Sequence, residues 1–170
     1  MFLLTLTITK VSFSTEQQNE WAILDKDNYK IEYPSDWMLD ESGNMGTSFI
    51  LFSPLVNSED KFNENVNLMI QDVSTYNLTF EQFVELSEKQ IESMLTDGKI
   101  LSSELVTIDG NNVQKLIFNG KQGEYDLQFE QYYMMRGPIA YVLTFTSEKN
   151  EFDKYQEVGE KIMNTFELKK

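Results

Sequence analysis

The chain has 170 residues, of which 41% are hydrophobic and 13% aromatic, and a formal net charge of −14 at pH 7. This length and composition predict one folded domain and exclude disorder as a description of the whole chain. The negative charge repels phosphate groups, which disfavours nucleic acids and anionic membrane surfaces as partners.

The sequence lacks two residue types that catalytic and metal sites commonly use. It has no cysteine, which excludes disulfides, thiolate metal ligands and a lipid-anchoring cysteine. It has no histidine, which removes the commonest general base and every catalytic triad that needs one. We therefore predict no catalytic residue, no cofactor and no enzymatic activity.

The N-terminal residues 1–20 are compatible with two interpretations. Phe2 to Thr9 is apolar but too short to cross a membrane, so it fits a secretory signal peptide that lacks its first residues, although Lys10 interrupts the run. Alternation of aliphatic residues with threonines in the same run also fits a strand. We favour the signal peptide, followed by a polar linker up to residue 20. It predicts export to the periplasm or outside the cell, with a cytoplasmic location as the alternative and no membrane insertion of the mature protein.

The domain is expected to span residues 21–168 and to begin with a short strand at Trp21–Leu24. From Tyr29 to Tyr33, apolar and charged residues alternate, the pattern of a strand with one buried face. Pro34 cannot donate to the ladder and ends this strand. Trp37 follows, and because truncating a buried tryptophan costs about 3–5 kcal/mol, we expect Tyr33, Pro34 and Trp37 to be structural anchors of the core.

The middle of the chain alternates between loops and strands. We predict a polar loop over 39–46, a strand that is covered on both faces and central in its sheet at Phe49–Phe52, a charged loop over 57–65, and an alternating strand from Val66 to Ile70.

The clearest predicted helix covers residues 79–96. Thr79 and Gln82 have the spacing of a capping box, and an apolar stripe at helical spacing follows. Gly98 fits a left-handed residue that ends the helix. Antiparallel strands are then expected at 100–108, 113–119, 125–135 and 139–146, and a last helix at 151–166. The predicted fold class is α+β, an antiparallel sheet of about six to eight strands between layers of helices.

Several of these segments together resemble the PsbP-like family. The resemblance rests on the run Tyr29 to Trp37, on Gly46 to Pro54, on Asn65 to Gln71 and on Ile162 to Phe166. This family includes the extrinsic PsbP subunit of photosystem II, bacterial DcrB-type envelope proteins and a Ran-binding Mog-type protein. The resemblance implies an antiparallel sheet with helices on both faces and a mostly non-enzymatic function.

Three functional hypotheses follow. The first is an exported, non-catalytic module that contacts a protein partner, with Tyr132, Met134 and Arg136 as candidate contact residues if they share an exposed patch. The second is a small-ligand or calcium carrier with a pocket near Trp37, in which the acidic loops 36–41 and 59–64 supply oxygen ligands. The third is an enzyme that uses two buried carboxylates in one cleft. The partner, the oligomeric state and the metal ligands are not predicted.

Overall fold

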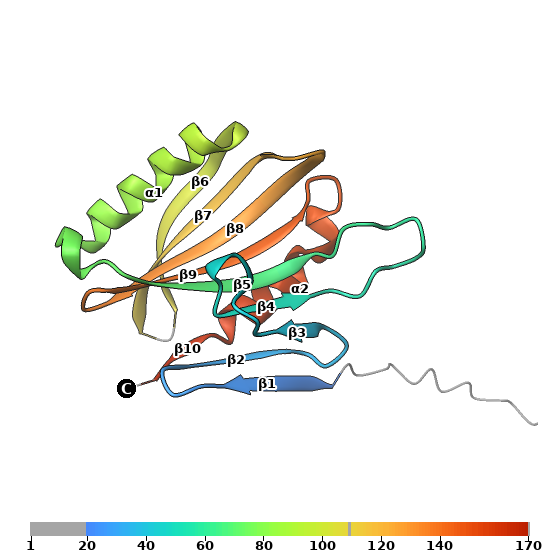
Figure 1. Cartoon of the computed structure of the whole chain (residues 1–170), viewed down its shortest axis with the longest axis horizontal. Helices are drawn as coiled ribbons and strands as arrows, with labels where there is room; N and C mark the ends of the chain where they lie inside the picture. Colours follow the sequence, from blue (N-terminus) through green and yellow to red (C-terminus); the bar gives the residue numbers. More distant parts are fainter. Residues whose placement is uncertain (1–19, 109, 170) are drawn as a thin grey trace, which may run out of the picture.

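The described part of the chain, residues 20–108 and 110–169 of a computed structural model, forms two antiparallel sheets and two helices (Figure 1). The predicted signal peptide and nearly all of the linker lie outside these residues. The first five strands are β1 (Trp21–Asp25), β2 (Tyr29–Pro34), β3 (Met38–Asp40), β4 (Phe49–Phe52) and β5 (Asn65–Asp72). Helix α1 (Phe80–Met94) precedes β6 (Thr96–Ile108), β7 (Asn111–Gln122), β8 (Tyr125–Arg136) and β9 (Ile139–Glu148), and α2 (Phe152–Asn164) precedes β10 (Glu167–Leu168).

The larger sheet has seven strands in the order β3-β4-β5-β9-β8-β7-β6, and the smaller sheet has the order β1-β2-β10. This architecture confirms the predicted α+β class. The prediction that β4 is central is wrong, because β4 lies next to the edge and only the short β3 separates it from solvent. Residues Phe49 to Leu51 are nevertheless buried, and Phe49 and Leu51 belong to the core on the α2 side. Part of the loop predicted at 39–46 belongs to β3.

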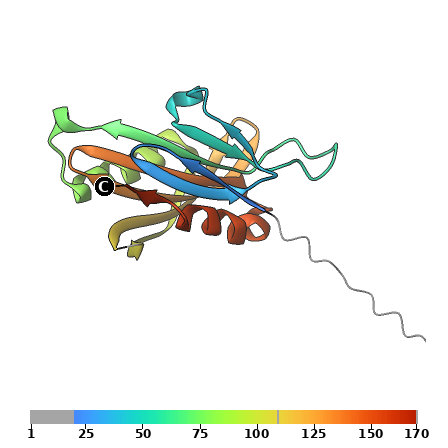
Figure 2. The ribbon, with the colours of Figure 1, turned by 90° about the horizontal axis from the view of Figure 1, so that it is seen from below.

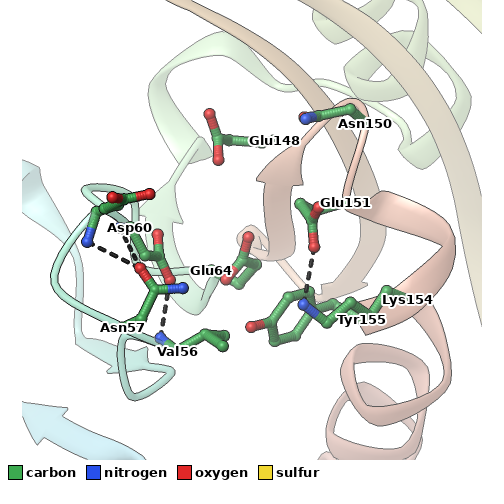
Figure 3. Close-up of a pocket in the computed structure, with 10 residues that line it drawn as sticks. Val56, Asn57, Asp60, Glu64, Glu148, Asn150, Glu151, Lys154 and Tyr155 are labelled. Atoms are coloured by element: carbon green, nitrogen blue, oxygen red, sulfur yellow. Dashed lines mark hydrogen bonds and ion pairs between the residues drawn. The ribbon is translucent and has the colours of Figure 1, made fainter.

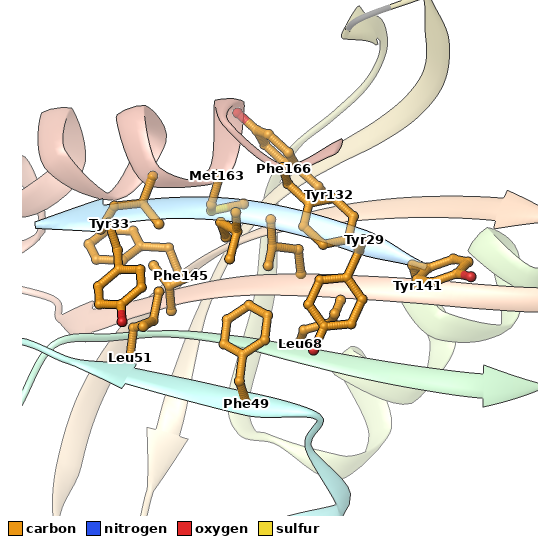
Figure 4. Packing of buried hydrophobic residues seen from close by; sticks show 14 of the residues in the cluster. Tyr29, Tyr33, Phe49, Leu51, Leu68, Tyr132, Tyr141, Phe145, Met163 and Phe166 are labelled. Carbon is orange, nitrogen blue, oxygen red and sulfur yellow. The ribbon is translucent and has the colours of Figure 1, made fainter. Parts of the chain in front are cut away.

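Alternate residues of the large sheet face two separate cores. On one face, α1 packs against residues such as Phe129 and Tyr133 of β8. On the opposite face, α2 and the small sheet pack against residues such as Leu68 and Phe145 (Figures 2 and 4). Here Tyr29 of the small sheet contacts both other layers: its ring centroid lies 5.8 Å from that of Phe49 and 5.7 Å from that of Phe166.

The three residues that we expected to anchor the core, Tyr33, Pro34 and Trp37, are all buried. The Trp37 amide donates to the Pro34 carbonyl oxygen at 2.9 Å, which closes the turn between β2 and β3. Trp37 packs in the core on the α2 side, and a small-ligand pocket next to it stays a prediction.

Helix α1 begins as the sequence predicts. The Gln82 amide donates to Thr79 Oγ1 at 3.3 Å, and the Thr79 amide donates to Gln82 Oε1 at 2.9 Å, so the capping box is complete. The predicted end is wrong in one respect: the left-handed residue after the helix is Asp97, with a φ of 55°, and not Gly98. Gly98 is required for space instead, because a Cβ there would lie 2.6 Å from the Ile91 carbonyl oxygen.

Replacing Thr79 with alanine is expected to lower the free energy of unfolding by about 1 kcal/mol, because it removes one half of the capping box. Urea unfolding measures the change. Thr75→Ala, at an exposed position before the helix, is the matched control and should stay close to wild type. Equal losses in both variants would show that the cap contributes nothing.

Candidate functional site: an acidic pocket beside the start of α2

The residues that we expected to contact a partner do not form a common patch. Tyr132 and Met134 are 3% and 6% exposed and belong to the core on the α2 side. Arg136 is exposed, and its guanidinium donates to the carbonyl oxygens of Leu168, at 3.1 Å, and Lys169. Arg136 thus holds the C-terminal strand β10, and Tyr132 and Met134 are almost fully buried in this fold.

A different site forms where the β4–β5 loop meets the first turn of α2 (Figure 3). The cavity has a volume of about 240 Å³. Ten residues line it: Val56, Asn57, Glu59, Asp60, Glu64, Glu148, Asn150, Glu151, Lys154 and Tyr155. Five of these are carboxylates and one is a lysine, so the pocket carries an excess of negative charge. We refer to it as the acidic pocket.

Side chains of the β4–β5 loop hold that wall of the pocket in place. Asn57 Oδ1 accepts from the amides of Glu59 and Asp60 at 2.8 and 3.2 Å. Asp60 Oδ2 accepts from the Val56 amide at 2.9 Å. Such side-chain-to-backbone bonds are what asparagine and aspartate contribute to turns. The loop is therefore shaped from within rather than by packing against the sheet alone.

Glu64 lies at the base of the pocket and is only 2% exposed. Ser53 and Ser147 donate their hydroxyls to the two carboxylate oxygens at 3.2 and 3.4 Å. Burial raises the pKa of Glu64, against the lowering effect of its hydrogen bonds. Burial and then the charge of Glu64 also raise the pKa of Tyr155, which lines the same pocket from the first turn of α2.

The charges of the pocket suit an organic cation better than a metal ion. Lys154 Nζ pairs with Glu151 Oε2 at 2.9 Å, so the lysine is held on the wall. Within residues 20–108 and 110–169, no three or more acidic side chains come together closely enough to hold a metal. Of the two acidic loops that we considered for calcium, only 59–64 contributes to the pocket.

A carboxylate enzyme would need two buried acids in one cleft. Burial raises the pKa of both Glu64 and Glu130. Glu130, however, is 0% exposed beneath α2, pairs with Lys115 and does not line the pocket. The two carboxylates whose pKa values are raised therefore lie in different places and do not form a catalytic pair.

Sequence reasoning found only one side of this pocket. It marked the acidic loop 59–64 but not Glu148, Glu151 or Tyr155, which are about 90 residues away along the chain. The one available signal was the clustering of acids at the predicted start of the last helix.

The sequence matches no family model and no curated protein. Among solved structures, the chain is similar to PsbP (CyanoP) from Synechocystis sp. PCC 6803, with 10% identity and a TM-score of 0.68 over 94% of this chain and 98% of that chain. It is also similar to LpqN of Mycobacterium tuberculosis, described as involved in cell envelope biogenesis, with 8% identity and a TM-score of 0.63 over 89% and 91% of the two chains.

A third similar structure is PA94 of Pseudomonas aeruginosa, a protein of unknown function, with 16% identity and a TM-score of 0.64 over 88% of this chain and 98% of that chain. Neither described helix combines the length and apolarity that a membrane-spanning helix needs. At these identities the comparisons concern the fold, and they agree with the sequence resemblance: this chain has the PsbP-like fold.

Proposed function

We propose that the protein is a non-catalytic binding module that holds a basic segment of a partner protein in the acidic pocket, and that it acts after export from the cytoplasm. The observation that carries this proposal is Glu64, a carboxylate that is 2% exposed and whose pKa burial raises. A PsbP-like fold with no histidine is in keeping with a binding role.

The buried carboxylate of Glu64 lowers the stability of the protein when no partner is bound. A raised carboxyl pKa means that the ionised form is stabilised less in the folded protein than in water. The two serine hydroxyls only partly compensate for burial. A positively charged group in the pocket would stabilise the ionised form of Glu64, and stability lost at a site in the free protein is often recovered on binding.

A lysine or arginine side chain of a partner fits the arrangement of charges. The carboxylates are spread around a cavity of about 240 Å³ and do not converge on one point. The net charge of −14 attracts a basic segment over a longer range and speeds its association. Val56 and Tyr155 supply apolar surface for the aliphatic part of such a side chain.

Glu64→Gln is expected to weaken binding of a lysine- and arginine-rich peptide by about tenfold, the equivalent of ~1.4 kcal/mol. Fluorescence anisotropy with a labelled basic peptide measures the affinity, and a peptide with neutral glutamines in the basic positions is the ligand control. Glu92→Gln, on the exposed outer side of α1, is the matched variant and should bind like wild type. If both variants bind equally, general charge attraction explains binding and the pocket has no role.

The same substitution is expected to stabilise the free protein at pH 7. The folded state holds the Glu64 proton more tightly than the unfolded chain, so this group's contribution to stability falls as pH rises from about 4.3 through the raised pKa. The stability gained by Glu64→Gln should therefore be full at pH 7 and vanish below about pH 4. Urea unfolding of wild type and variant across this range tests it. A variant that is less stable at pH 7 would mean that Glu64 is a structural carboxylate.

A further inference from the structure

A second cavity lies on the opposite face of the large sheet from α2. Helix α1 lies beside β6 at one side of this face (Figure 1), and its apolar side chains share a core with Val142 of β9 and Met69 of β5. Between α1 and these strands runs a groove with a volume of about 560 Å³. Its lining comes from α1, the segment before it, and β5, β8 and β9. This volume lies within the range of small-molecule sites in proteins.

None of the residues that line the groove is charged, although 25% of the chain is. The floor consists of apolar or aromatic side chains that are already mostly buried: Phe83 at 7%, Tyr133 at 3% and Val142 at 8% exposed. At the rim, Tyr76 and Leu86 are 73% and 46% exposed. The groove is thus an uncharged surface in an otherwise strongly acidic protein.

The polar groups of the floor are already bonded to each other. Gln131 Nε2 donates to Thr144 Oγ1 at 2.9 Å, and the Tyr133 hydroxyl donates to Gln131 Oε1. Ser87 Oγ donates to the Phe83 carbonyl oxygen at 2.9 Å. A ligand in the groove therefore gains little from polar groups that face the floor. Gln71, Gln90 and the hydroxyl of Tyr76, all exposed at the rim, are polar side-chain groups that it can reach.

These features restrict what can occupy the groove. β9 is paired with β5 and β8, whereas β5 is paired with β4 only as far as Leu68, so the groove offers an extended peptide backbone partners only along Met69–Asp72. A charged ligand would find no opposite charge. We propose that the groove binds a small uncharged molecule with an apolar body.

The test uses Nile red, an uncharged dye that fluoresces in apolar sites, and competition by 1-alcohols from hexanol to decanol. Affinity is expected to rise about fourfold with each added CH₂, the equivalent of ~0.8 kcal/mol. Decanoate and decyltrimethylammonium have apolar chains of matching length but carry a charge, and they should compete at least about tenfold more weakly. A flat dependence on chain length, or equal competition by either charged analogue, would overturn the proposal.

Two variants locate the site. Ser87→Trp fills the groove and is expected to abolish Nile red binding, whereas Glu92→Trp, on the exposed outer side of α1, should keep it. Leu86→Ser changes only the rim and keeps the assay decisive if Ser87→Trp does not fold. Retained binding in a folded Ser87→Trp or in Leu86→Ser would place the dye elsewhere and refute the proposal. Glu64→Gln should leave Nile red binding unchanged, which separates this site from the acidic pocket.

Discussion

Replacing Lys115 with methionine is expected to lower the free energy of unfolding by about 3–5 kcal/mol, the cost of breaking a buried ion pair. Lys115, on β7, reaches under α2 and lies 2.9 Å from Glu130 Oε1 and 2.7 Å from Glu160 Oε1. Glu130 is 0% exposed, and within residues 20–108 and 110–169 Lys115 is the cation that forms an ion pair with its carboxylate. The lysine therefore joins the sheet to α2 through two carboxylates.

The direction of the pH effect follows from the same geometry. Burial raises the pKa of Glu130, and Lys115 opposes that rise. Without the lysine, the pKa of Glu130 rises further, and the folded protein takes up a proton there. Because the folded variant binds this proton more tightly than the unfolded chain does, the free energy of unfolding of Lys115→Met falls as pH rises. The difference from wild type should therefore be largest at neutral pH and smaller toward pH 4. Urea unfolding at several pH values measures the change.

Two controls isolate the pair. Lys121→Met, on the same strand, breaks an exposed ion pair with Asp97 and should cost less than about 1 kcal/mol. The double variant Lys115→Met/Glu130→Met replaces both charges with apolar groups of similar size and should recover most of the lost stability. If the double variant is as unstable as Lys115→Met, the lysine acts through packing and not through its charge.

Gly159→Ala is expected to lower the free energy of unfolding by about 1–3 kcal/mol, although alanine is the better helix former by about 1 kcal/mol. Gly159 lies in the middle of α2, and a Cβ there would lie 2.7–2.8 Å from ring atoms of Phe145. That ring is fully buried in the core between α2 and the sheet and cannot move aside freely (Figure 4). The glycine therefore sets how closely α2 approaches β9.

A double-mutant cycle with Phe145→Leu distinguishes close packing from a general helix effect. In the Phe145→Leu background the steric conflict is relieved, and Gly159→Ala should become neutral or stabilising by up to about 1 kcal/mol. Thermal or urea unfolding of the four proteins gives the coupling energy. If alanine is equally harmful in both backgrounds, the contact with Phe145 is not the reason for the glycine.

Local chemistry in the sequence determined much of the fold. The alternation from Tyr29 to Tyr33 predicted β2, and the spacing of Thr79 and Gln82 predicted the start of α1, because both signals depend only on residues close in the chain. The later strands and α2 were also predicted at nearly their observed positions. The resemblance of several such segments to the PsbP-like family then gave the layered architecture.

The tertiary structure decided the rest, because it depends on which distant segments meet. The segment Tyr132–Met135 of β8 is apolar on both faces, so no pattern could show that Tyr132 and Met134 are buried under α2 rather than exposed. The role of Gly159 depends on a phenylalanine ring of another element. The acidic pocket joins a loop near residue 60 to the start of α2 near residue 150, and burial in the folded protein is the largest cause of the raised pKa of Glu64. The sequence contains the acidic residues of the pocket in two distant segments, and only the packing of the layers brings these segments together.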